Sequence, residues 1–169
     1  MKFKSLFLIS SALVFLTGCA SSSENNVINN ASSEEEIQSY KMGDTVKVGN
    51  YKITVNSATN SKEVGSEYLR TKTENNFVTL NVKLKNCDKS ELTIYGSMIV
   101  YHVGESQYEP AGAGIYLDNG FYYSYSIGAG LIKTIDVVYE IPSNFSTNDY
   151  LEAKETSRSS KGIRIYLSK

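Results

Sequence analysis

The stretch Val78-Thr79-Leu80-Asn81-Val82-Lys83-Leu84-Lys85 decides the fold class of this 169-residue chain. Its apolar and polar residues alternate strictly, so an extended strand would have one apolar and one polar face. A helix would scatter the same apolar residues around its circumference. The stretch therefore predicts a strand with one face in a hydrophobic core, and the turn-forming residues 86–90 end it.

The same period of two recurs along most of the chain. Alternation or short apolar runs predict further strands and a hairpin at residues 45–50, 51–55, 122–125, 131–141, 150–154 and 163–167. Between 92 and 103 both parities are apolar, which predicts a strand covered on both faces or bulged at Gly96. The polar residues 57–75 predict a loop or a short helix. Seven or eight short antiparallel strands in about 130 residues predict an all-β sandwich.

The first residues have the features of a secretory signal peptide. Lys2 and Lys4 precede an apolar run, residues 5–15, that is too short for a comfortable membrane span. The run ends in Leu16-Thr17-Gly18-Cys19, which resembles the lipobox of bacterial lipoproteins, where the cysteine is diacylated and begins the mature chain. We therefore predict a signal peptide at 1–18 and lipidation of Cys19, since two acyl chains hold a protein stably on a membrane.

A flexible linker is predicted between the lipid and the folded domain. Residues 20–39 are rich in Ser, Asn and Glu and contain few large apolar side chains. Such a segment cannot bury enough surface to order itself. The predicted organisation is therefore a lipidated cysteine and linker at 19–39, with a root-mean-square reach of about 25 Å, followed by one domain at 40–169.

The charge of the chain argues against nucleic acid as a partner. The sequence has 17 basic and 18 acidic residues, so no net field gathers a polyanion. Removal of Lys2 and Lys4 with the signal peptide lowers the basic count to 15 against 18 acids, a net charge of −3. This average argues against a polybasic contact with anionic lipid. The lipid on Cys19 is thus the expected membrane anchor.

Three segments of the predicted domain resemble a known family. Residues 43–57, 76–86 and 137–142 look like the immunoglobulin-like, telokin-like domain of unknown function found in many Gram-positive lipoproteins. The resemblance extends over about residues 42–168. It implies an immunoglobulin-like sandwich on the outer face of a Gram-positive cell membrane, and it brings no catalytic residues and no cofactor.

The sequence contains no catalytic or metal-binding motif that we can identify. P-loop, GxGxxG, HExxH and GxSxG patterns are all absent. His102 is the only histidine and lies in an apolar stretch, so we predict a structural role for it. Cys87 has no intramolecular partner once Cys19 is lipidated, and an inert thiol at a turn is predicted. Asp118-Asn119-Gly120 predicts a turn rather than a calcium loop. We expect no enzyme activity, metal or cofactor.

One aromatic cluster invites a functional interpretation. The rings of residues 116–125 lie beside glycine-rich loops that we expect to be flexible, and a tyrosine offers both an apolar ring and a hydroxyl for recognition. The possible ligand surface comprises Tyr116, Phe121, Tyr122, Tyr123 and Tyr125. The alternative is a hairpin whose rings simply cap the sandwich. The leading hypothesis is a lipid-anchored binding or accessory domain with an envelope protein or glycan as partner. A carrier of a small molecule or metal, or an envelope hydrolase, is the alternative.

Overall fold

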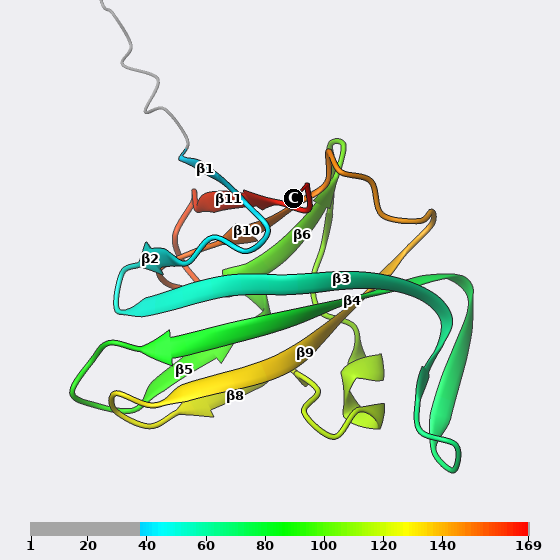
Figure 1. The fold of residues 1–169 in the computed structure, drawn as a ribbon, viewed down its shortest axis with the longest axis horizontal. Coiled ribbons are helices and arrows are strands. Elements are labelled where there is room, and N and C mark those ends of the chain that lie inside the picture. Colours follow the sequence, from blue (N-terminus) through cyan, green and yellow to red (C-terminus); the bar gives the residue numbers. More distant parts are fainter. Residues whose placement is uncertain (1–37, 169) are drawn as a thin grey trace, which may run out of the picture. The chain divides into compact units, whose positions relative to one another are not determined.

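A computed structural model describes residues 38–168, and the sites predicted at Cys19 and in the linker lie outside them. The described part is an all-β sandwich with 11 strands and two short 3₁₀ turns (Figure 1). One sheet has the order β2-β3-β4-β9, and the other β1-β11-β10-β6-β7, while β5 and β8 form a separate pair. The predicted fold class is confirmed, and the strand number exceeds seven or eight because the sequence pattern does not register three-residue edge strands such as β1 and β7.

The four-stranded sheet comprises β2 (Val46–Val48), β3 (Tyr51–Gly65), β4 (Arg70–Asn86) and β9 (Ile132–Ile141). The five-stranded sheet comprises β1 (Ser39–Lys41), β6 (Ile99–Val103), β7 (Ser106–Tyr108), β10 (Tyr150–Ala153) and β11 (Ile163–Tyr166). The remaining elements are β5 (Leu92–Tyr95), β8 (Ser124–Ile127) and the turns η1 (Gly96–Met98) and η2 (Gly112–Tyr116). All strand pairs are antiparallel except β1 with β11.

The alternation in β4 has the predicted consequence. Its four apolar side chains are buried between the sheets, while Lys83 and Lys85 are exposed on the outer face. Apolar residues of β3, β9, β6, β10 and β11 complete the core. The core members from both sheets include Ile53, Val55, Val78, Leu80, Val82, Leu84, Ile99, Tyr101, Ile135, Val137, Tyr139, Leu151 and Ile165.

Buried tyrosines link the two sheets. The buried rings of Tyr101 and Tyr139 stack across the core with their centroids 5.1 Å apart. The Tyr139 hydroxyl donates to the Ile99 carbonyl at 2.9 Å, and the Tyr51 hydroxyl donates to the Lys154 carbonyl at 2.7 Å. Each bond joins the two sheets and satisfies a hydroxyl that would otherwise be buried without a partner.

The prediction of a loop or helix at 57–75 is wrong. β3 and β4 continue through this region as a long hairpin that closes at residues 66–69 (Figure 1). Most of its side chains are exposed, so no apolar alternation marks the strands. Backbone pairing forms them instead, with ion pairs from Arg70 and Lys72 to Glu63 on the neighbouring strand.

Two other boundaries differ from the predictions. The apolar stretch 92–103 is not one bulged strand, because η1 interrupts it and passes the chain from β5 in the small sheet to β6 in the large one. The strand predicted at 122–125 begins two residues later, at Ser124, because Tyr122 and Tyr123 form a tight turn. The predicted turn at 86–90 is present, and the buried Asn86 amide donates to the carbonyls of Ser90 and Ile127.

Candidate functional site

Three exposed tyrosines lie close to the start of β8 in the fold. Tyr123 is 70% exposed and Tyr122 is 41% exposed, and their rings meet at a centroid distance of 4.1 Å with a tilt of 55°. The exposed Tyr95 lies on the neighbouring strand, opposite Ser124. We call these three residues, Tyr95, Tyr122 and Tyr123, the tyrosine patch. A hydrogen bond between the Tyr122 and Tyr123 side chains raises the pKa of Tyr122.

The backbone of the tyrosine patch is strained. Tyr123 has a φ of 61° and is the one non-glycine residue with a positive φ among the described residues. The Ser124 N–H donates to the Tyr122 carbonyl at 2.7 Å, so the three residues form a γ-turn of the rare positive-φ type. The Tyr123 carbonyl accepts from the Gly96 N–H at 3.0 Å, which ties the turn to the strand pair. Such a conformation costs about 1–3 kcal/mol.

The structure divides the predicted ligand surface. Tyr122 and Tyr123 are exposed, but the inclusion of Phe121 is wrong, since its side chain is fully buried in the main core. Tyr125 packs against that core and is half-buried, and Tyr116 is half-buried at the end of η2. Phe121 precedes the γ-turn and packs in the core, whereas Tyr122 and Tyr123 belong to the turn at the surface. Tyr95 was missed because it lies far from the cluster in sequence.

The glycines beside the patch permit close packing rather than flexible loops. A Cβ on Gly114 would lie 2.0 Å from the Phe121 carbonyl oxygen, and a Cβ on Gly120 would lie 1.7 Å from the Gly114 carbonyl oxygen. Neither distance is possible for two non-bonded atoms. Gly114 and Gly120 thus allow η2 and the following turn to pack directly on the backbone that carries Phe121, and the expectation of flexible loops is wrong here.

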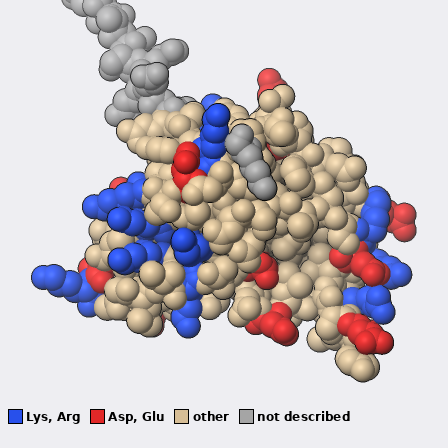
Figure 2. Space-filling model, in the orientation of Figure 1, with Lys and Arg blue, Asp and Glu red and all other residues tan. Residues whose placement is uncertain are grey.

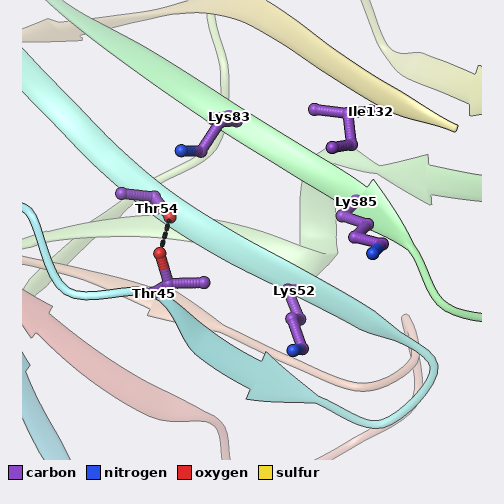
Figure 3. Close-up of a pocket in the computed structure, with 6 residues that line it drawn as sticks. All are labelled: Thr45, Lys52, Thr54, Lys83, Lys85 and Ile132. Atoms are coloured by element: carbon purple, nitrogen blue, oxygen red, sulfur yellow. Dashed lines mark hydrogen bonds between the residues drawn. The ribbon is translucent and has the colours of Figure 1, made fainter.

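A shallow pocket of about 260 Å³ lies on a different surface, over the outer face of β3 and β4. Its lining residues are Thr45, Lys52, Thr54, Lys83, Lys85 and Ile132 (Figure 3). The hydroxyls of Thr45 and Thr54 are joined by a 2.7 Å hydrogen bond. The lining contains no carboxylate, imidazole or thiol, so its chemistry is that of hydrogen-bond donors and positive charge.

A family model described as a domain of unknown function, DUF4352, matches residues 40–162. The chain belongs to the DUF4352 family. This agrees with the resemblance to an immunoglobulin-like domain of unknown function. No curated protein sequence matches this DUF4352 chain.

Solved structures share the fold of this DUF4352 domain at low sequence identity. An uncharacterised β-sandwich protein from Clostridium difficile is 18% identical with a TM-score of 0.51, over 79% of this chain and 96% of the other. The secreted protein MPT63 from Mycobacterium tuberculosis is 10% identical with a TM-score of 0.56, and the match covers 80% of this chain and 99% of MPT63. A candidate lipoprotein from Bacillus subtilis, ycdA, is 12% identical with a TM-score of 0.50, and the match covers 72% of this chain and 38% of ycdA. At these identities the likeness establishes the fold.

His102 has the structural role that the sequence predicts. In this DUF4352 domain it is buried on β6, and both ring nitrogens have partners on β10: Nε2 lies 3.1 Å from Glu152 Oε2, and Nδ1 lies 3.2 Å from the Tyr150 hydroxyl. The Tyr150 ring also stacks on the imidazole with centroids 4.5 Å apart. Glu152 is shared further with Lys154 at 3.4 Å. The group cross-links two strands of the larger sheet.

The remaining candidates lie apart from one another. Cys87 is exposed at the turn after β4, and no disulfide involves it among residues 38–168. The Asp118-Asn119-Gly120 segment is a turn, in which the Gly120 N–H donates to the Leu117 carbonyl. The described part of the chain contains no group of three or more His, Cys, Asp or Glu residues placed to hold a metal ion. Within it no helix is long and apolar enough to cross a membrane.

Proposed function

We propose that this DUF4352 protein is a lipid-anchored, extracytoplasmic binding domain without catalytic activity, which recognises a protein of the cell envelope through its tyrosine patch. The observation that carries the proposal is Tyr123, whose ring is 70% exposed on a strained γ-turn. A fold that only needed to close β8 would place glycine or asparagine there. Strained backbone at an exposed position is typical of binding sites.

The chemistry of the patch suits a protein partner. Tyrosine is enriched among the residues that contribute most to protein–protein affinity, since it buries a large rigid ring at low entropic cost. The rings of Tyr122 and Tyr123 are tilted by 55°, so they form a ridge rather than the flat platform on which a sugar ring stacks. Attachment to the sheet through Gly96 holds this ridge in place before a partner binds.

The proposed location depends on the sequence at Cys19. Its lipobox-like setting predicts a diacylated anchor on the outer face of the cell membrane. MPT63 is described as secreted and ycdA as a candidate lipoprotein, which agrees with an extracytoplasmic site. Replacement of Cys19 by Ala should release the protein from the membrane fraction into the soluble fraction. Retention of Cys19→Ala in washed membranes would contradict the anchor.

Site-specific photo-crosslinking in intact cells tests the tyrosine patch. A benzoylphenylalanine at position 123 should capture one discrete envelope protein, and an additional Tyr122→Ala substitution should reduce its yield. The matched control is the same probe at Tyr68, which is 93% exposed at the tip of the β3–β4 hairpin. Equal products from both positions, or none from position 123, would refute recognition of a protein here. Protection of position 123 by purified glycan would reassign the partner.

A further inference from the structure

The outer face of the four-stranded sheet brings lysines from three strands into contact range. Lys47 of β2 pairs directly with Lys52 of β3, and Lys52 pairs directly with Lys85 of β4. Lys83 lies two residues along β4 on the same face. Neighbouring strands are about 4.8 Å apart, so these like charges oppose one another at a cost in stability. We call Lys47, Lys52, Lys83 and Lys85 the lysine face.

Acidic residues do not neutralise the lysine face. None of its four side chains forms an ion pair within residues 38–168, whereas Arg70 and Lys72 share Glu63, and Lys154 reaches Glu152. Figure 2 shows a group of basic residues over the end of the molecule where β2 and the adjoining ends of β3 and β4 lie, and further basic residues at the far end of the β3–β4 hairpin. The net charge of −1 for the whole chain therefore does not describe this surface. An anion placed in the pocket on this face would meet lysine side chains and threonine hydroxyls.

Exposed aliphatic side chains border the lysine face. Leu131 is 53% exposed and Ile132 is 57% exposed, at the point where the chain enters β9 after the loop 128–130. Ile132 pairs directly with Lys85, so the row across the sheet runs Lys47, Lys52, Lys85, Ile132. Ile132 also lines the pocket with Lys83 and the two threonines (Figure 3). Ile132 thus places exposed apolar surface in the same area as the lysines, and Leu131 precedes it where the chain enters the edge strand β9.

We propose that the lysine face, together with Leu131 and Ile132, docks the domain onto a bilayer that contains anionic phospholipid. Lysines near such a surface attract lipid phosphates, and the adjoining aliphatic side chains enter the acyl boundary. A soluble phosphodiester polymer would use the lysines but leave Leu131 and Ile132 in water. The proposal rests on the membrane location given above, because a linker with a reach of about 25 Å would keep this face near the bilayer.

Docking would give the tethered domain a fixed orientation. Leu131 and Ile132 follow β8, whereas Tyr122 and Tyr123 precede it, so the two surfaces lie at opposite ends of that strand. With the lysine face on the bilayer, the tyrosine patch stays accessible to a partner. A lipid anchor at Cys19 would keep the local lipid concentration high, so weak intrinsic binding would suffice for docking.

Vesicle flotation with an unlipidated chain that starts at Ala20 tests the proposal without the anchor. This chain keeps every described residue, and the folded core lies wholly within residues 38–168. It should float with vesicles that contain phosphatidylglycerol and not with pure phosphatidylcholine vesicles. Because screening shortens the Debye length from about 10 Å at 0.1 M salt to about 3 Å at 1 M, high salt should release most of the protein. Cys87, two residues after Lys85, would be its single thiol and can carry an environment-sensitive dye.

Matched variants separate the two components of docking. Lys52→Glu with Lys85→Glu should weaken binding to phosphatidylglycerol vesicles by at least about tenfold, as expected for two lysines near an anionic surface. Arg158→Glu with Lys161→Glu changes the net charge equally at exposed positions of the β10–β11 loop and should bind normally. Leu131→Gln with Ile132→Thr should weaken binding several-fold.

Leu69 supplies the aliphatic control for the variant at Leu131 and Ile132. Leu69→Gln, at an exposed position on the β3–β4 hairpin, should have no effect on vesicle binding. Equal loss in the Arg158/Lys161 variant, or flotation with neutral vesicles, would overturn the proposal. So would binding to soluble polyphosphate that does not depend on Leu131 and Ile132, combined with no flotation. Failure of the photo-crosslink at Tyr123 would leave these results unaffected, since no partner protein is present.

Discussion

Glycine and alanine variants should rank in opposite orders of stability at Tyr123 and at Tyr122. At Tyr123 the glycine variant should be the more stable, and at Tyr122 the alanine variant. Both substitutions remove the ring, so a comparison of the glycine with the alanine variant isolates the backbone. At a φ of 61° an L residue carries a cost of about 1–2 kcal/mol that glycine avoids. Glycine loses about 0.5–1 kcal/mol through the entropy of the unfolded chain. We therefore expect Tyr123→Gly to be more stable than Tyr123→Ala by up to about 1.5 kcal/mol.

At Tyr122 the backbone has no positive φ, so the expected order is reversed. Tyr122→Gly should be less stable than Tyr122→Ala by about 0.5–1 kcal/mol. A difference of about 1 kcal/mol corresponds to about 3–5 °C in Tm for a domain of this size, which thermal unfolding followed by circular dichroism resolves. Urea titrations of the four variants provide an independent free energy. If Tyr123→Gly melts at or below Tyr123→Ala, the γ-turn is not strained and the main support for the proposed binding site is lost.

Three further predictions concern the core. Phe121→Ala should lower the free energy of unfolding by about 3–5 kcal/mol, and a mild loss would place the ring at the surface. Gly114→Ala should destabilise the domain by at least about 1 kcal/mol in urea, whereas Gly112→Ala, whose Cβ meets only a ring edge at 3.7 Å, should be tolerated. Burial raises the pKa of Tyr101 and Tyr139. Their contribution to stability should therefore be constant below the unfolded-state tyrosine pKa of about 10, and stability should fall as pH rises above it. Because other tyrosines are exposed, the test compares absorbance at 295 nm in the protein with that in Tyr101→Phe and Tyr139→Phe, and a difference that develops before unfolding would contradict their burial.

The strands that the sequence predicts well are those with one solvent-exposed face and one buried face. In β4 and β9 the apolar residues recur at every second position, and this local pattern survives any change in tertiary arrangement. In the far half of the β3–β4 hairpin most side chains on both faces are exposed, so the same strand pairing leaves no alternation of apolar and polar residues in the sequence. The continuous apolar run at 92–103 hides the turn at Gly96 for the opposite reason, since residues of both parities are buried there.

The candidate surfaces were only partly predictable. A count of aromatic residues locates Tyr122 and Tyr123, but it cannot separate them from Phe121, because the turn that decides which rings face solvent depends on a bond to Gly96. The lysine face could not be predicted from the sequence for a different reason. Its members come from three strands and are brought together by strand register, whereas net charge averages them with acids on other surfaces.

By itself the sequence determines the lipobox-like motif at Cys19, the polar linker and the all-β class, because each depends only on residues that are adjacent or alternate along the chain. The tertiary structure alone decides which tyrosines are exposed and which lysines face one another. Both depend on pairing between distant strands, where a shift of one residue moves every side chain to the opposite face. The functional surfaces of this DUF4352 domain are therefore properties of the strand register.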